Sequence, residues 1–198
     1  MSEGKFIVFY GINILGKTTQ SGIISRQIAL ENSVRVHRIK YPIYNLDPTG
    51  SEINDYLRNE NPKELTPHQH QELQLQNRFD YQPILFETLN SGIWVLAEDY
   101  TLTGIAWGIA TGVDENFLRK KTNSLMEEDF GILFDGEQFN HREESHKYET
   151  NYNLTKKCRE IHLRLAEEFG IPVINANQEK EKVTKDILNI LKEWGLMK

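Results

Sequence analysis

A short apolar run that leads straight into a glycine-rich octapeptide is the feature that most limits the folds open to this chain. The run from Phe6 to Tyr10 is continuously apolar, as is typical of a strand buried on both faces of a sheet. The octapeptide from Gly11 to Thr18 fits the pattern Gly-x-x-x-x-Gly-Lys-Ser/Thr. A helix is expected directly afterwards, over residues 18–30. Strand, loop and helix in this order predict a βα unit that binds phosphate at the amino-terminal end of the helix.

Each part of this phosphate-binding loop has a physical task. The two glycines let the backbone wrap closely, so that successive N–H groups point at phosphate oxygens. Lys17 can bridge the β- and γ-phosphates as a mobile charge, and the Thr18 hydroxyl can coordinate Mg²⁺. The residues expected to hold the triphosphate are Gly11, Asn13, Gly16, Lys17, Thr18 and Thr19.

The remainder of the chain alternates between expected strands and expected helices. Further strands are predicted over residues 34–40, 93–97, 130–134 and 171–175. Helices are predicted over 52–58, 66–89, 104–109, 115–118, 154–169 and 179–194. Thr66 should cap the second of these helices, and Pro83 should bend or split it. This order predicts a three-layer α/β P-loop NTPase fold, with a five-stranded parallel sheet covered by helices on both faces and residues 1–198 forming one domain.

Composition narrows the classes of partner and compartment. The formal net charge of -6 argues against broad nucleic-acid binding, which requires a basic face, but leaves room for a small nucleotide. The one cysteine, Cys158, falls in an expected helix and is interpreted as a structural thiol. No stretch approaches 18 apolar residues, and the first residues lack a signal-peptide layout, so we expect a cytoplasmic protein without membrane contact. The histidines, including His68 and His70, show no metal-ligand spacing and are read as surface residues.

The phosphate-binding loop alone does not separate kinases from GTPases. GTPases usually carry an Asn-Lys-x-Asp segment that reads the base, and this sequence has none, which favours a small-molecule kinase that uses ATP and Mg²⁺. Glu98 follows the strand expected over 93–97, at the sheet edge where ligands of open α/β sheets bind. It could hold Mg²⁺ with Thr18, or orient the acceptor hydroxyl. The alternative for Glu98 is a structural ion pair.

Several segments together resemble the thymidylate kinase family over nearly the whole chain. They are the loop with Lys17-Thr18-Thr19-Gln20, Tyr41-Pro42, the helix ending in Asn77-Arg78, Glu98-Asp99-Tyr100, His146-Lys147-Tyr148-Glu149 and Asn175-Ala176-Asn177-Gln178. The resemblance implies a nucleoside monophosphate kinase that converts dTMP and ATP to dTDP and ADP. It also implies adenine contacts from Asn175 and Asn177, and a mobile lid around residues 136–152. In that lid, Lys147 by resemblance or Arg142 by its guanidinium chemistry would close over the phosphates, although a solvated loop is the alternative.

The acceptor side departs from the family pattern. The family's Phe-Pro-x-Arg arginine, which grips the acceptor phosphate, is Tyr44 here, and the arginine of its Asp-Arg-Tyr segment is Asp99. The aromatic residue that stacks on thymine is Gln74, and the acidic residue of the loop is Asn13. Arg78 is the first choice to compensate, before Arg38 and Lys40. Trp107 and Tyr100 could stack on the acceptor base, although core packing is the commoner fate of such aromatics.

These departures leave two other readings open. The acceptor could be an unphosphorylated nucleoside or a modified nucleotide, because two guanidinium groups are missing from the phosphate site. The chain could also be a non-catalytic module that uses nucleotide binding as a switch. Relatives of the family are commonly dimers, and the helix near residues 67–89 could supply such an interface.

Overall fold

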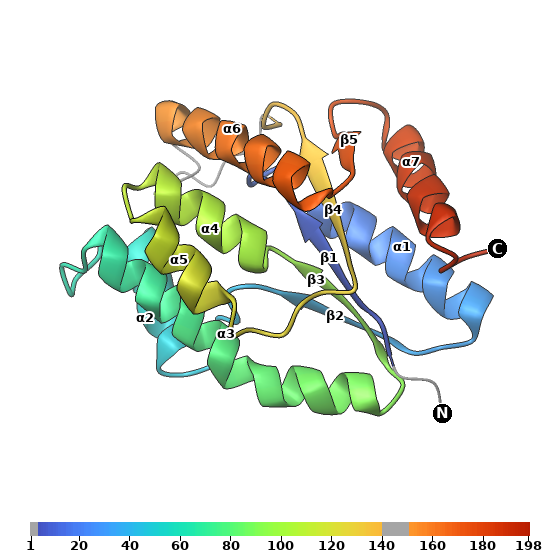
Figure 1. Cartoon of the computed structure of the whole chain (residues 1–198), viewed down its shortest axis with the longest axis horizontal. Coiled ribbons are helices and arrows are strands. Elements are labelled where there is room, and N and C mark those ends of the chain that lie inside the picture. The colour runs from blue at the N-terminus through green and yellow to red at the C-terminus, as the bar shows by residue number, and fades with distance from the viewer. Residues whose placement is uncertain (1–3, 140–150) are drawn as a thin grey trace.

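The computed structural model describes residues 4–139 and 151–198 and contains a five-stranded sheet in the order β2-β3-β1-β4-β5 (Figure 1). The bounds of the strands are β1 Phe6–Tyr10, β2 Val36–Lys40, β3 Trp94–Glu98, β4 Phe130–Asp135 and β5 Val173–Asn175. Every neighbouring pair is parallel. The carboxyl ends of all five strands therefore meet at one edge, where the loop after β1 lies.

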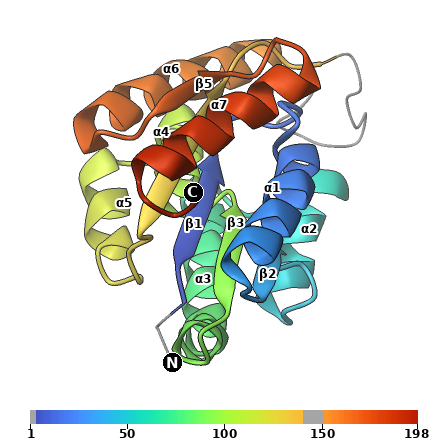
Figure 2. The ribbon, with the colours of Figure 1, turned by 90° about the vertical axis from the view of Figure 1, so that its right-hand side faces the viewer.

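Helices cover both faces of this sheet. They are α1 Lys17–Asn32, α2 Thr49–Arg58, α3 Pro67–Asn90, α4 Thr101–Ala110, α5 Glu115–Thr122, α6 Tyr152–Phe169 and α7 Lys180–Glu193. The helices α1 and α7 pack together on one face, and α3, α4 and α6 lie on the other (Figures 1 and 2). The α5 helix packs on α4, and α2 packs on α3. The predicted three-layer α/β fold with five parallel strands is confirmed.

The core is densest around the two strands nearest the middle of the sheet. All residues of β1 and β3 are buried, because helices cover both of their faces. The edge strands β2 and β5 are partly exposed, in keeping with the polar residues that β2 carries. Cys158 is buried in α6, which agrees with a structural thiol. The rigid centre of the sheet thus carries the segment that runs into the phosphate-binding loop.

Two helices begin three residues earlier than the sequence predicted. The α2 helix starts at Thr49 instead of residue 52, because Gly50 lets the helix approach the loop closely: a Cβ there would lie 2.3 Å from the Tyr44 carbonyl oxygen. The α4 helix starts at Thr101 instead of residue 104. Thr66 caps α3 as predicted, with its side chain accepting from the Gln69 N–H. Pro83 does not split α3, which continues through it to Asn90.

The reading of the histidines as surface residues is wrong for two of them. His70 is fully buried and stacks on Tyr56, with ring centroids 3.8 Å apart. His162 is also buried, between the Cys158 carbonyl group and the Thr103 hydroxyl. His68 is exposed, as predicted. Local spacing could not separate these cases, because tertiary packing of one helix on another decides which ring is covered.

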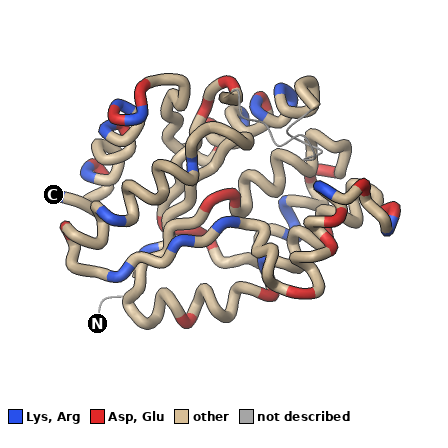
Figure 3. Tube along the Cα trace, turned by 180° about the vertical axis from the view of Figure 1, so that it is seen from behind, with Lys and Arg blue, Asp and Glu red and all other residues tan. Residues whose placement is uncertain are grey.

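Charged residues of both signs are interspersed over the surface. On α7, at the upper left of Figure 3, Lys and Glu alternate along the helix. None of the helices within residues 4–139 and 151–198 is both long enough and apolar enough to cross a lipid bilayer. The lid expected around residues 136–152 falls mostly outside the described residues, and so do Arg142 and Lys147.

Candidate active site

The phosphate-binding loop leaves the carboxyl end of the central strand β1. In the sheet register, Phe9 of β1 and Lys40 of β2 both lie beside Glu98, and Asp135 lies beside Asn175. The ends of five strands therefore surround the loop. This is the crevice in which open α/β sheets bind ligands.

The loop backbone requires its two glycines. Gly11 has a φ of 135°, and a Cβ at this position would lie 2.5 Å from the Phe134 carbonyl oxygen. Gly16 has a φ of 78° and precedes α1 directly, in a left-handed conformation that costs glycine least. The first turn of α1 contains no acidic residue. An anion at this helix end meets N–H donors and a favourable dipole, and no acidic residue of the first turn opposes it.

Lys17 is held inside the loop by three partners. Its Nζ donates to the carbonyl oxygens of Gly11 at 2.9 Å and Ile12 at 2.7 Å, and lies 3.2 Å from Asp99 Oδ1. The lysine side chain is only 4% exposed. A phosphate that enters the loop can replace Asp99 as the anion next to this ammonium group. The position agrees with the role predicted for Lys17.

Asp99 therefore lies next to the site proposed for the phosphate donor as well as the site proposed for the phosphate acceptor. Its φ is 63°, which is uncommon for a residue other than glycine, and its N–H donates to the Phe9 carbonyl oxygen at 3.1 Å. The Thr103 hydroxyl donates to Asp99 Oδ1 at 3.4 Å. The sequence suggested that Asp99 would repel an acceptor phosphate unless Mg²⁺ intervened. In the structure Lys17 already balances this charge.

Glu98 accepts hydrogen bonds from hydroxyl groups of α1. Thr18 Oγ1 donates to Glu98 Oε2 at 2.7 Å, and Ser21 Oγ donates to Oε1 at 3.0 Å. Within the described part of the chain, Glu98 has no ion-pair partner, which argues against the structural ion pair considered for it. Arg38, one of the cations considered for the acceptor, instead donates to Ser21 Oγ at 3.0 Å.

The pairing of Thr18 with Glu98 suits a magnesium ion chemically. A hydroxyl and a carboxylate are hard oxygen ligands, and Mg²⁺ in kinases takes one or two protein ligands, with water and phosphate oxygens completing its shell. Among the described residues no group of three or more His, Cys, Asp or Glu side chains is arranged to hold a metal. A dedicated all-protein metal cage is thus not what these residues build.

A cavity of about 140 Å³ opens beside the loop. It brings together five residues predicted for the acceptor site and the loop residue Asn13. They are Tyr44, Gln74, Arg78, Asp99 and Trp107. We call this space the acceptor cavity.

Tyr100 does not line the acceptor cavity. Its ring is buried between Phe6 and Tyr41, and its hydroxyl donates to the Met126 carbonyl oxygen at 3.1 Å. Burial raises the pKa of this hydroxyl well above its usual range. Of the two aromatic residues proposed to stack on the base, the structure brings only Trp107 to the cavity, while Tyr100 has the core role that was its alternative.

Two neighbouring residues of α3 hold the two walls of this cavity. The Asn77 amide brackets Ile43, accepting from its N–H at 2.7 Å and donating to its carbonyl oxygen at 3.0 Å. Arg78 donates through Nη2 to the Tyr100 carbonyl oxygen at 3.1 Å and through Nη1 to the Gln74 carbonyl oxygen at 2.6 Å. Burial lowers the pKa of Arg78, whose side chain is almost inaccessible. Both Nη groups of Arg78 are thus committed to the wall, whereas its buried Nε has no hydrogen-bond partner among the described residues.

Arg58 and Gln71 are among the residues of the acceptor cavity that the sequence did not predict. Arg58 is the last residue of α2, and Gln71 lies on α3. The apolar stripe of α2 is Ile53, Tyr56 and Leu57. Arg58 flanks this stripe, and its position beside a buried face was the signal that could have identified it.

The proposed adenine contacts lie on the opposite side of the loop. Asn175 and Asn177 line an open cavity of about 640 Å³ together with Phe139. The Asn177 amide donates to the Glu137 carbonyl oxygen at 2.8 Å, and the Phe139 N–H donates to the Ile14 carbonyl oxygen at 3.1 Å. The segment after β4 is thereby fixed to the phosphate-binding loop.

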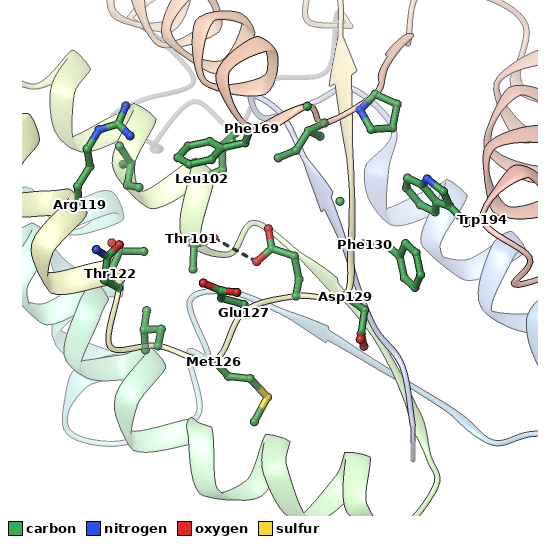
Figure 4. Close-up of a pocket in the computed structure, with 18 residues that line it drawn as sticks. Thr101, Leu102, Arg119, Thr122, Met126, Glu127, Asp129, Phe130, Phe169 and Trp194 are labelled. Carbon is green, nitrogen blue, oxygen red and sulfur yellow. Dashed lines mark hydrogen bonds between the residues drawn. The ribbon is translucent and has the colours of Figure 1, made fainter. Parts of the chain in front are cut away.

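The largest cavity described, about 810 Å³, lies away from this chemistry (Figure 4). It opens near Phe130, at the other end of β4 from the loop, between Phe169 and Trp194. One of its lining residues, Glu128, accepts a hydrogen bond from the Tyr10 hydroxyl, and burial raises the pKa of Glu128. Its size does not make it the active site, because it contains none of the residues around the phosphate-binding loop.

Comparisons with known proteins agree with this geometry. The sequence profile described as thymidylate kinase matches residues 9–187. A thymidylate kinase of Dictyostelium discoideum is 26% identical over 195 residues, which cover 96% of this chain and 86% of that protein. A probable thymidylate kinase of Methanocaldococcus jannaschii is 26% identical over 198 residues, which cover 97% of this chain and 98% of that protein.

Solved structures show the same fold. The thymidylate kinase of Candida albicans superimposes with a TM-score of 0.83 at 21% identity, covering 99% of this chain and 94% of that chain. The enzyme of Ehrlichia chaffeensis gives a TM-score of 0.75 at 16% identity, covering 96% and 99%. With a family match over most of its length and a phosphate-binding loop set beside an acceptor cavity, this chain belongs to the thymidylate kinase family of phosphotransferases.

Proposed function

We propose that this protein transfers the γ-phosphate of ATP to a nucleoside monophosphate, with dTMP as the leading acceptor. The observation that carries the proposal is the shared wall between the two halves of the site. Asn13 and Asp99 line the acceptor cavity, and Asp99 also pairs with Lys17 of the phosphate-binding loop. A phosphate bound in the cavity would therefore lie next to the triphosphate.

The roles of the donor-side residues follow from what phosphoryl transfer requires. The reaction needs positioning and neutralisation of charge more than covalent chemistry. The loop N–H groups and Lys17 would hold the β- and γ-phosphates. Asn175 and Asn177 would lie beside the adenine, and Gln74 and Trp107 beside the acceptor base. Thr18 and Glu98 would hold Mg²⁺, which neutralises charge on the phosphates when bound.

The test of the activity is ADP release, measured with a coupled assay over the common ribo- and deoxyribonucleoside monophosphates. We expect dTMP to give the highest kcat/KM. Absence of stimulation by every monophosphate, together with retained ATP binding, would count against the proposal and favour the non-catalytic module. Stimulation by unphosphorylated nucleosides alone would support the alternative acceptor.

The Lys17→Ala variant tests the donor site. We expect kcat to fall by at least about 100-fold, since removal of one preorganised charge donor costs several kcal/mol of transition-state stabilisation. The substitution also leaves Asp99 buried without its cation, so the double variant Lys17→Ala/Asp99→Asn serves as the matched control for folding. Equal activity of either variant and the wild type, with native circular dichroism, would refute the assignment.

The exposed side of α3 around Phe86 supports a homodimer as part of this proposal. Phe86 is 53% exposed and lines an open depression with Pro83 and Leu125. Ile84, 47% exposed, lies two residues earlier and so on another side of the helix. An exposed apolar patch of the kind around Phe86 is typical of subunit interfaces. Light scattering should give twice the monomer mass, and Phe86→Asp should give the monomer.

We further propose a cytoplasmic location, in keeping with the buried free thiol of Cys158.

A further inference from the structure

The acceptor phosphate proposed above needs a cation, and among the residues that the structure describes three candidates lie around the acceptor cavity. A nucleoside monophosphate carries a dianion at the reacting end, and guanidinium groups bind phosphate best because they donate two parallel hydrogen bonds. The cations that line the cavity are Lys40, Arg58 and Arg78. This inference rests on the proposed function, because it concerns the phosphate of its acceptor.

Arg78 is the weakest of the three candidates despite its place in the cavity wall. Its guanidinium donates to backbone carbonyl oxygens of Gln74 and Tyr100, and its side chain is only 3% exposed. A Cβ at Gly104 would lie 3.4 Å from Arg78 Nη2, so the group is also closely packed. Turning it toward a phosphate would leave two buried carbonyl groups without their donor. Its contacts make Arg78 a brace of the wall.

Lys40 is exposed and presents a point charge on a flexible stem. It is the last residue of β2, lines the acceptor cavity and lies beside Glu98 in the sheet register. It can attract an anion but fixes no direction, because an ammonium group does not match the planar pair of phosphate oxygens. Orientation of the acceptor must therefore come from another cation.

Arg58 has the support that an orienting cation needs. It ends α2 with its guanidinium carbon 4.9 Å from the centre of the Tyr44 ring. Its Nη1 donates to the Tyr44 hydroxyl at 2.9 Å and to Asn54 Oδ1 at 3.3 Å. A ring beneath the plane and a hydroxyl at its edge restrict both the tilt and the rotation of the group. The side chain is half-buried, which strengthens its attraction for an anion.

We propose that Arg58 is the anchor of the acceptor phosphate and that Tyr44 is its positioning residue. Tyr44 stands where the family pattern has the phosphate-binding arginine. Because the Arg58 guanidinium contacts the tip of the Tyr44 side chain, α2 supplies from position 58 the charge that position 44 lacks. Until a triphosphate enters the loop, Asp99 does not cancel this charge, because Lys17 pairs with it at 3.2 Å.

The test separates binding of the phosphate from binding of the nucleoside. Isothermal titration of dTMP and of thymidine is performed on the wild type, Arg58→Gln and Tyr44→Phe. Arg26→Gln, a charge-matched change at an exposed site on α1, is the control. For Arg58→Gln we expect dTMP affinity to fall about 10- to 100-fold, the range for one charge-assisted pair, with thymidine affinity unchanged. Tyr44→Phe should show a smaller loss of the same kind.

A relocated arginine gives the sharpest confirmation. The double variant Arg58→Gln/Tyr44→Arg should recover at least tenfold of the lost dTMP affinity, because the guanidinium returns to the same part of the cavity. If Arg58→Gln lost equal affinity for dTMP and thymidine, or lost none for either, Arg58 would not be the phosphate anchor. The proposed kinase function would still stand. Failure of the wild type to bind any nucleoside monophosphate would overturn both.

Discussion

Asp99 shows how one side chain can serve two halves of a site. It pairs with Lys17 across the phosphate-binding loop and also lines the acceptor cavity. Its left-handed backbone conformation is supported by the hydrogen bond from its N–H to Phe9. Until a nucleotide enters, this carboxylate is the anion nearest to the loop lysine. It therefore competes with the triphosphate for the same ammonium group.

The Asp99→Asn variant should bind ATP about tenfold more tightly than the wild type. The expected gain reflects roughly 1–2 kcal/mol of repulsion between a carboxylate and a phosphate several ångströms apart at an effective dielectric constant near 20. The thermal midpoint of the empty variant should fall, because a buried ion pair has lost one partner. Titration calorimetry with Mg²⁺ and ATP measures the effect. Asp80→Asn, on the exposed side of α3, is the control and should leave ATP binding unchanged.

An arginine at position 44 and an arginine at position 99 should have different effects in this structure. The Tyr44 side chain is half-buried at the acceptor cavity, so an arginine there would lie near Arg58 but stay partly solvated. Asp99 is 6% exposed and lies against Lys17, so arginine at that position would place two cations together in a packed site. We therefore expect Tyr44→Arg to tighten dTMP binding and Asp99→Arg to lower stability.

At the scale of elements, α3 organises the acceptor side. It supplies Gln71, Gln74 and Arg78 to the cavity and holds the loop after β2 through Asn77. The Asn77 amide also donates to the Thr49 hydroxyl at 3.0 Å, which ties the start of α2 to the same residue. The neighbouring segments around Ile43 and Thr49 are thus both joined to the distant α3 at one buried amide.

The Asn77→Ala variant should lose about 2–4 kcal/mol of unfolding free energy. The substitution leaves the buried N–H and carbonyl group of Ile43 without their partners, and each such loss costs about 1–3 kcal/mol. Urea denaturation provides the measurement. Gln76→Ala, one residue earlier on the exposed face, should change stability by less than about 0.5 kcal/mol. A similar loss for both variants would contradict the role given to Asn77.

The sequence predicted the elements better than the side-chain contacts of the site. The phosphate-binding loop is local in sequence, so the pattern around Lys17 predicted its conformation. The start of α2 at Thr49 was missed because Pro48 and Gly50 are turn residues by local preference, whereas close packing against Tyr44 decides the matter. The pairings of Lys17 with Asp99 and of Arg58 with Tyr44 join distant segments, so no local pattern could predict them.

At the scale of the whole molecule, a polar chain runs from the loop into the far helix layer. Asp99 accepts from Thr103, whose hydroxyl lies 3.2 Å from His162 Nε2 on α6. His162 Nδ1 lies 2.9 Å from the Cys158 carbonyl oxygen. Burial lowers the pKa of His162 from 6.5 to about 4, so the ring is neutral at pH 7. The charges that act on it from a distance are those of Lys17, Asp99 and Asp135.

This buried ring predicts a loss of stability on acidification. Between pH 6.5 and about 4 the unfolded chain binds a proton at His162 that the folded chain does not, so unfolding free energy falls as pH falls through this window. The contribution of this one group is at most about 3–4 kcal/mol, the free-energy equivalent of the pKa change. Denaturation at several pH values should show a shallower slope for His162→Gln than for the wild type. Parallel slopes would show that His162 does not titrate in this way.

The consecutive residues Asn77 and Arg78 fasten opposite walls of the acceptor cavity to one helix. Because both walls are bonded to α3, the cavity cannot widen by moving the two walls apart independently. An acceptor of larger girth must therefore shift α3 bodily or project toward the open edge beside the phosphate-binding loop. The size of acceptor that the enzyme accepts should therefore depend on the position of α3. Substitutions on the outward face of α3, far from any substrate, should be able to alter the range of acceptors.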